Sequence, residues 1–122
     1  MSGTGKKILI FEDNHNIALL LRTFFERKNY QVRLVEDGVD AVAVAQEFSP
    51  HLILMDIIMP GKNGIAACTD LRREGITTPI VMLTSKSFDD DRKRAIEAGA
   101  NAYVLKPFDP KKLENVIIPL LS

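Results

Sequence analysis

The sequence predicts an α/β protein in which five parallel strands form one sheet with helices on both faces. Two observations lead to this fold class. Short apolar, β-rich runs alternate five times with longer segments of helical spacing. Four of these runs also end in polar residues, as expected where parallel strands finish at one ligand-binding edge. A chain of 122 residues fits a single domain of this class.

The strands are predicted over five ranges: Lys7–Phe11, Gln31–Val35, Leu52–Met55, Pro79–Leu83 and Ala102–Leu105. The first, third and fourth are continuously apolar around their centres, which is typical of strands covered on both faces. Polar residues interrupt the second and fifth, which indicates edge strands. The predicted strand order is therefore 2-1-3-4-5, with a switch point between the first and third strands. This order places Glu36 and Asp37, which follow an edge strand, outside the site.

Apolar residues at helical spacing fill the segments between the strands. The clearest stripes belong to the first and last segments: Ile17, Leu20, Leu21, Phe24 and Phe25, then Leu113, Val116, Ile117 and Leu120. Asn14 and Asp37 are predicted to cap helix starts, and Gly75 and Gly99 to close helices.

Three residues in the helical segments carry separate expectations. Proline removes a helix hydrogen bond and clashes with the preceding turn, so Pro119 should kink or stop the last helix near Ile117–Ile118. Cys68 is expected to contribute to helix packing. His15 should lie in the first turn of the first helix, near the metal site but outside its ligand shell.

The composition is that of an ordinary globular protein, with 46% hydrophobic and 26% charged residues. Sixteen basic residues balance sixteen acidic ones, so no net charge favours nucleic acid or anionic membrane. One cysteine excludes an internal disulfide, and no apolar stretch approaches the roughly 20 residues of a membrane span. We expect a cytoplasmic protein without membrane insertion or direct nucleic-acid binding. Residues 1–5 are predicted to be a flexible tail before a domain of residues 6–122.

The polar strand endings form the candidate site. Glu12 and Asp13 follow the first strand, Asp56 follows the third, Thr84 the fourth and Lys106 the fifth. Three carboxylates brought together repel one another unless a cation neutralises them. An oxygen-only, acid-rich cluster suits Mg²⁺, with Mn²⁺ as an alternative. The competing interpretation, in which the acidic pair only caps a helix, does not explain the matching strand ends.

Asp56 is the candidate nucleophile, because a carboxylate at a strand end can attack phosphorus and form an acyl phosphate. This reaction depends on charge neutralisation more than on a base. Lys106 supplies a suitable cation, and Thr84 supplies a hydroxyl that can donate to the same phosphoryl oxygens. Ser85 is small and leaves room for a phosphoryl donor. Pro107 makes a cis peptide bond after Lys106 plausible.

These residues resemble the receiver domain of two-component response regulators, and the chemotaxis-type, single-domain members are the most similar in size. The resemblance covers about residues 6 to 121 and implies a flavodoxin-like, three-layer sandwich. It depends on a combination of motifs: Glu12-Asp13, Asp56 to Pro60 with Gly64, Thr84-Ser85, Gly99-Ala100, and Tyr103 with Lys106-Pro107-Phe108.

The resemblance implies that Asp56 accepts a phosphoryl group from a histidine kinase or a histidine phosphotransfer protein. It also implies that Asp13, Asp56 and the carbonyl of Ile58 bind Mg²⁺, while Glu12 acts mostly through water. Such a protein is a signalling switch and not an enzyme with a separate substrate. It catalyses only its own phosphoryl transfer and slow self-dephosphorylation.

By the same resemblance, Thr84, Ser85 and Lys106 hold the phosphoryl oxygens, and Tyr103 turns inward on activation. The movement reshapes the fourth helix, fifth strand and fifth helix, which then bind a downstream protein that the sequence does not identify. Ile58 and Lys86 are expected to flank the phosphorus. Ile58 cannot hydrogen-bond an attacking water, so slow self-hydrolysis is expected.

The chain departs from dimerising, DNA-binding members of the family at Asn101-Ala102, where those proteins usually carry an acidic pair. A monomer or weak dimer is therefore expected. His51 is expected to be a surface loop residue. Four other kinds of protein compete with this interpretation: a flavin-binding protein, an aspartyl phosphohydrolase, a non-phosphorylated scaffold, and a receiver fragment of a longer regulator with an effector domain. Glu12-Asp13 would repel a flavin phosphate, and Ile58 stands where the phosphohydrolases carry a second aspartate.

Overall fold

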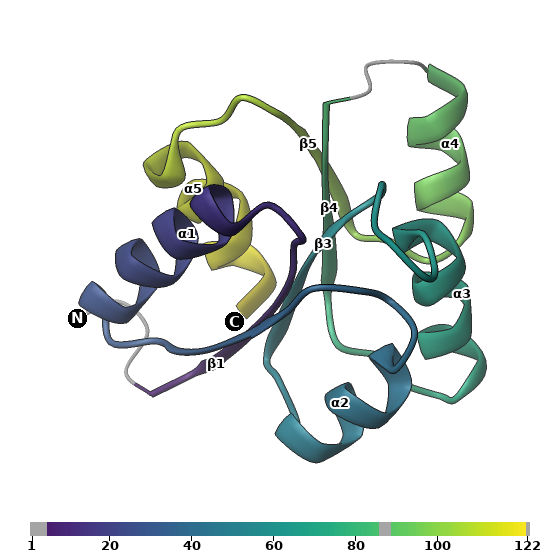
Figure 1. The fold of residues 1–122 in the computed structure, drawn as a ribbon, viewed down its shortest axis with the longest axis horizontal. Coiled ribbons are helices and arrows are strands. Elements are labelled where there is room, and N and C mark those ends of the chain that lie inside the picture. The colour runs from purple at the N-terminus through teal and green to yellow at the C-terminus, as the bar shows by residue number, and fades with distance from the viewer. Residues whose placement is uncertain (1–4, 86–88, 122) are drawn as a thin grey trace.

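The computed structural model describes residues 5–85 and 89–121, and it is an alternating β/α protein (Figure 1). The strands are β1 (Lys7–Phe11), β2 (Gln31–Val35), β3 (Leu52–Asp56), β4 (Ile80–Thr84) and β5 (Ala102–Leu105). The helices are α1 (His15–Arg27), α2 (Ala41–Phe48), α3 (Gly64–Arg73), α4 (Asp89–Glu97) and α5 (Pro110–Leu121). Every predicted strand is present, and its bounds differ from the prediction by at most one residue.

The five strands form one parallel sheet in the order β2-β1-β3-β4-β5. This confirms the predicted α/β class, the strand order and the flavodoxin-like, three-layer arrangement. The central strands β1, β3 and β4 are almost wholly buried, whereas β2 and β5 at the edges are only partly buried. The continuous apolar runs in the sequence therefore correctly predicted that β1, β3 and β4 are covered on both faces.

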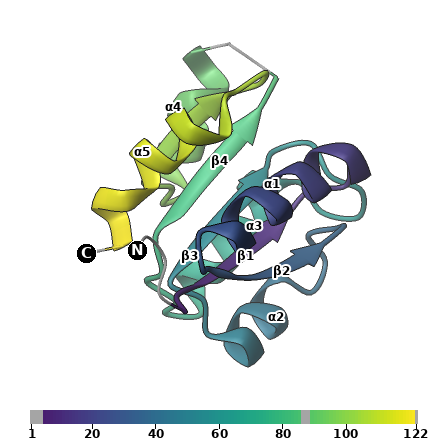
Figure 2. The same ribbon diagram turned by 90° about the vertical axis from the view of Figure 1, so that its left-hand side faces the viewer.

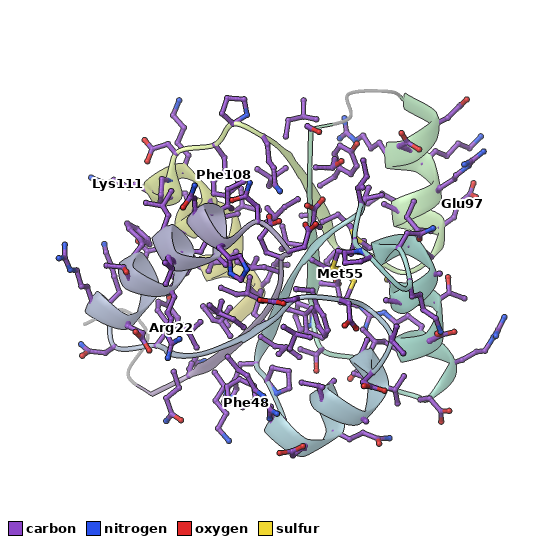
Figure 3. The ribbon with its side chains drawn as sticks, viewed as in Figure 1. Arg22, Phe48, Met55, Glu97, Phe108 and Lys111 are labelled. Carbon is purple, nitrogen blue, oxygen red and sulfur yellow. The ribbon has the colours of Figure 1, made fainter. Side chains whose placement is uncertain are left out.

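The sheet separates two hydrophobic clusters, because successive side chains of a strand point to opposite faces. Helices α2, α3 and α4 cover one face, and α1 and α5 cover the other (Figures 1 and 2). Leu9 and Phe11 of β1 belong to the first cluster, while Ile8 and Ile10 belong to the second. Met55 lies inside the molecule, and Figure 3 shows it between the sheet and α3.

The helix ends follow the predictions except at α2. Asn14 caps α1, and its side chain accepts a hydrogen bond from the backbone of Ile17. Gly75 and Gly99 follow α3 and α4 with positive φ angles of 78° and 111°, which favour glycine. The prediction for Asp37 is wrong. The N-cap of α2 is Asp40, and the Asp37 carboxylate instead accepts a hydrogen bond from the backbone of Val39 within the preceding loop.

Pro119 was predicted to kink or stop α5 near Ile117–Ile118. A stop there is wrong, because the helix continues to Leu121 with Pro119 inside it, and the kink stays a prediction. Two contacts hold this end of the helix. Ile117 is fully buried in the core, and the Nζ atom of Lys6 donates a 2.7 Å hydrogen bond to the carbonyl of Leu121. A proline at position 119 removes the amide donor to the carbonyl four residues earlier, and the carbonyls of the last turn have no intrahelical partner in any helix, so Lys6 satisfies one of these.

Cys68 and His51 lie where the sequence predicts. Cys68 is fully buried in α3, as predicted, and His51 is exposed in the loop before β3. Lys86 lies outside the described residues. The division into a tail over residues 1–5 and a domain over residues 6–122 stays a prediction, although the amide of Gly5 donates to the carbonyl of Asn29. Within the described ranges, no helix is long and apolar enough to cross a membrane.

Candidate functional site

The ends of four strands meet at one edge of the sheet. Glu12 comes directly after β1, Asp56 and Thr84 are the last residues of β3 and β4, and Lys106 follows β5. Glu12, Asp56 and Lys106, together with their neighbours, surround an open pocket of about 450 Å³, whereas Thr84 is fully buried and does not line it. Its lining residues are Glu12, Asp13, Asn14, Ile17, Asp56, Ile58, Ser85 and Lys106. The sheet thus brings together the residues that the sequence placed at this edge.

Lys106 joins two of the carboxylates directly. Its Nζ atom donates to Oε1 of Glu12 and, at 2.9 Å, to Oδ2 of Asp56. Both carboxylates are buried, with 2% of Glu12 and 7% of Asp56 exposed. Buried carboxylates need a counter-charge or hydrogen bonds to remain ionised. Lys106 gives each carboxylate one hydrogen bond and a shared counter-charge.

Backbone amides hold the other carboxylate oxygens. Oδ1 of Asp56 accepts from the amide of Ile58 at 3.2 Å, and Oε2 of Glu12 accepts from the amide of Asn14 at 3.2 Å. Gly64 permits the loop after β3 to pack closely, since a Cβ there would lie 2.2 Å from the carbonyl oxygen of Asp56. The loop after β3 therefore packs against the backbone of Asp56 through a contact that only glycine allows.

The pKa values follow from burial and from this bonding. Burial raises the pKa of Glu12, and the hydrogen bonds from Lys106 and from the Asn14 amide only partly oppose it. Burial alone would lower the pKa of Lys106, but its hydrogen bonds to Glu12 and Asp56 outweigh burial and raise it. The ammonium is thus a stable cation at neutral pH, whereas ionised Glu12 is unfavourable without additional positive charge.

The carboxylates also form a cation site by geometry. One oxygen from each of Glu12, Asp13 and Asp56 lies within 4.8 Å of the others, and Asp13 is exposed toward solvent. An oxygen-only donor set that is partly open fits Mg²⁺, which retains several water ligands and is held by few carboxylates. The donor chemistry and the geometry of the three carboxylates fit a divalent cation here.

Thr84 and Ser85 lie differently at the same edge. Thr84 is fully buried and its carbonyl accepts from the amide of Lys106 at 2.7 Å, whereas Ser85 is exposed and lines the pocket. The peptide bond between Lys106 and Pro107 is cis, as the sequence suggested. Tyr103 is partly buried in β5 against the cluster under α2, α3 and α4. Burial raises the pKa of its hydroxyl.

Two lining residues were not predicted as part of the pocket. Asn14 was expected only as a helix cap and Ile17 only as a core residue, yet Asn14 at the N-cap and Ile17 in the first turn of α1 both line the pocket. The signal was present, since Asn14 directly follows the acidic pair and Ile17 is one helical turn further. His15 starts α1 as expected and is exposed, with Nε2 3.3 Å from the carboxylate of Glu36.

Comparison with known proteins decides the family. The response regulator receiver domain family matches residues 8–118. This chain belongs to that family. Over 107 residues it is 42% identical to the transcriptional regulatory protein ResD of Bacillus subtilis. The aligned region covers 88% of this chain but 44% of ResD. The chain spans about half the length of the curated relatives it matches.

Solved receiver domains have the same fold. The BeF3-activated receiver domain of RstA from Klebsiella pneumoniae matches with a TM-score of 0.90 at 33% identity, covering 95% of this chain and 98% of that one. A receiver domain of a Pseudomonas aeruginosa sensor histidine kinase matches with a TM-score of 0.87 at 32% identity, covering 96% and 98%. That structure has a magnesium ion coordinated in its active-site cleft. Membership of the family makes this chain a component of two-component signalling, in which receiver domains take phosphoryl groups from histidine kinases.

Proposed function

We propose that this receiver is a phosphorylation-activated switch in which Asp56 accepts the phosphoryl group. The observation that carries the proposal is the arrangement around Lys106, which bonds Asp56 and Glu12 beside an open pocket. A carboxylate held next to a stable cation and a candidate cation site has what an acyl-phosphate-forming nucleophile requires. The donor is a histidine kinase or a histidine phosphotransfer protein.

In the transfer, a carboxylate oxygen of Asp56 bonds to phosphorus while the bond from phosphorus to the donor's imidazole nitrogen breaks. The electron pair of the broken bond stays on the imidazole. Lys106 leaves its carboxylate partners and donates to the phosphoryl oxygens, together with the hydroxyls of Thr84 and Ser85. Glu12, Asp13, Asp56 and the carbonyl of Ile58 would hold Mg²⁺, which neutralises phosphoryl charge when bound.

The proposed readout runs from Thr84 to Tyr103. In β4, the alternation of side chains puts Thr84 on the same face as Met82, and Met82 pairs in register with Tyr103 of β5. Movement of Thr84 toward the phosphoryl group would therefore free space on the face where the Tyr103 ring packs. The surface of α4, β5 and α5 would change as Tyr103 turns inward, and a downstream protein would bind it.

The size of this switch can be bounded. A hydrogen bond to a charged group contributes about 1.5–3 kcal/mol. Shifting a two-state equilibrium from 1:99 to 99:1 requires about 5.5 kcal/mol. Phosphorylation alone thus shifts the population partly, and binding of the downstream protein completes the change. Identical NMR spectra of the phosphorylated chain with and without its partner, at Tyr103, would contradict this.

Acetyl phosphate tests the proposal without a known kinase. The protein is incubated with acetyl phosphate and Mg²⁺, and its intact mass is measured beside Asp56→Asn. One phosphoryl group on the native chain alone, lost when EDTA is present, is the expected result. Asp13→Asn is a matched variant that should lower the yield by weakening cation binding while keeping the acceptor. A native chain without adduct under these conditions would favour a non-phosphorylated scaffold.

A further inference from the structure

Arg72 of α3 makes a dense set of hydrogen bonds away from the pocket. Its guanidinium donates five bonds, and every acceptor is an uncharged oxygen. The acceptors are the carbonyls of Gly99, Ile76 and Thr78 and the side-chain oxygen of Asn101, at 2.7–3.1 Å. The planar fork of arginine suits such a set, because several donors are fixed together.

These oxygens lie in the segments that follow two helices. Ile76 and Thr78 come after α3, which ends at Arg73, and Gly99 comes after α4, which ends at Glu97, so one cation joins the two segments. Asn101 ties the same group to the sheet, since its side-chain oxygen also accepts from the amide of Ile80. The fit is tight: a Cβ at Gly99 would lie 2.6 Å from Cγ of Arg72.

The rest of α4 is held weakly by comparison. Among its described side chains only Ala95 is buried, whereas α3 buries Gly64, Ala67, Cys68 and Leu71. Ile96 of α4 is 47% exposed. The thiol of Cys68 lies 3.4 Å from the carbonyl of Ala98, so it adds a second contact from α3 to the same end of α4. The carboxyl-terminal end of α4 is thus fastened, while its remaining length has few buried contacts.

We infer that Arg72 is a positioning residue for the switch: it fixes the carboxyl-terminal end of α4, so that rearrangement on phosphorylation is confined to the other end of the helix. This inference rests on the proposed function, because it assigns where the α4–β5–α5 surface can change. The end of α4 that is free to move is the one that follows Thr84 and Ser85 in the chain. The fixed end keeps β5 in register with β4 through Asn101 and Ile80.

Amide hydrogen exchange, read by NMR, tests the inference. In the native chain, the amides of Ala98, Gly99 and Ala100 bond within the last turn of α4, to Arg94, Ile96 and Ala95. Their exchange should change less than about twofold on phosphorylation, while the amides of residues 92–94 change about tenfold or more. Equal changes at both ends of α4 in the native chain would overturn the inference.

Arg72→Met removes the five bonds while retaining an apolar stem. Without phosphorylation, exchange at Ala98–Ala100 should rise by at least about tenfold, because bonds to a charged donor are lost. With phosphorylation, the changes should extend to this end of the helix, which a purely structural residue would not cause. Unchanged exchange at Ala98–Ala100 in this variant would also overturn the inference.

Two further variants keep the experiment interpretable. Arg73→Met, at the exposed neighbouring position, should behave like the native chain. Arg72→Lys keeps the charge but not the fork, and it should give an intermediate result even if Arg72→Met folds poorly. The intact mass of each sample separates the two proposals. A native chain without adduct counts against Asp56 as acceptor, whereas increased exchange in unphosphorylated Arg72→Met still supports the anchor.

Discussion

The sheet has an amino edge, where its parallel strands begin, and a carboxyl edge, where they end. These two edges use cations in different ways. At the amino edge, Lys6, Lys7 and Arg72 donate to backbone carbonyls, namely those of Leu121, Phe48 and the residues after α3 and α4. At the carboxyl edge, Lys106 donates to two buried carboxylates beside a pocket. A backbone carbonyl is neutral, whereas a carboxylate is an anion that can bind Mg²⁺ in place of a lysine ammonium. The comparison indicates that one edge maintains the fold while the other can rearrange.

The largest expected effect is that of Lys106→Met compared with Lys7→Met. Loss of Lys106 should slow phosphorylation by acetyl phosphate by about 10²-fold, the typical effect of removing one donor to a developing anion. Lys7→Met should leave the rate within about twofold, since this lysine bonds a carbonyl of α2 and stacks over Phe48. Phosphorylation rates from mass spectrometry measure both. Equal losses in the two variants would remove the distinction between the edges.

Ile58→Asn should shorten the lifetime of the phosphoryl group. Ile58 is 52% exposed and lines the pocket, and an amide there could hydrogen-bond an attacking water. The half-life should fall about tenfold, the effect of one well-placed hydrogen bond in the transition state. Ile96→Asn, at an exposed position of α4, is the control. A native half-life shorter than that of Ile58→Asn would show that the isoleucine does not protect the acyl phosphate.

The raised pKa of Glu12 predicts a pH-dependent stability at the carboxyl edge. The folded state holds the Glu12 proton more tightly than the unfolded chain, so this group's contribution is present at low pH and is lost as pH rises through its raised pKa. In EDTA at pH 7, Glu12→Gln should therefore melt a few degrees above the native protein, and the difference should vanish toward pH 4.

Mg²⁺ should remove this advantage, because it stabilises ionised Glu12 and the variant lacks that charge. Melting curves with and without Mg²⁺ measure the effect, and Glu26→Gln, at an exposed position of α1, is the control. A variant less stable than the native protein in EDTA at pH 7 would mean that the bond to Lys106 outweighs burial.

The smallest expected effect concerns Lys6 at the amino edge. Lys6→Met should lower the free energy of unfolding by about 0.5–1.5 kcal/mol, the usual contribution of one hydrogen bond, and leave phosphorylation unchanged. Chemical denaturation of the native and variant chains measures the loss, and an unchanged free energy of unfolding would mean that Lys6 does not support the last turn of α5.

The sequence was informative where structure follows from chain periodicity. Apolar continuity identified β1, β3 and β4 as central, and parallel strands necessarily bring Glu12, Asp56 and Lys106 to one edge. The hydrogen bonds among these three side chains could not be predicted, because they depend on distances in space that the spacing of residues along the sequence does not give.

Contacts to backbone atoms were the least predictable. The acceptors of Arg72 are mostly carbonyls, which every residue has, so no pattern marks them. The end of α5 is stabilised by Lys6, 115 positions away in the chain. The cap of α2 is Asp40 and not Asp37, and both are aspartates in one loop, so the choice depends on how the loop turns.

The separation of the core by the sheet has a consequence for redesign. Tyr103 and the face it packs against belong to the cluster under α2, α3 and α4, while Ile8, Leu21, Phe25 and Leu113 form the other cluster. Exchanging side-chain volumes among Ile8, Leu21 and Phe25, which lie in β1 and α1 and outside the α4–β5–α5 surface, should change stability more than signalling. The same exchanges in the cluster under α2, α3 and α4 would also alter how readily the protein responds. The stability of the protein and its response to phosphorylation can therefore be adjusted largely on opposite faces of the sheet.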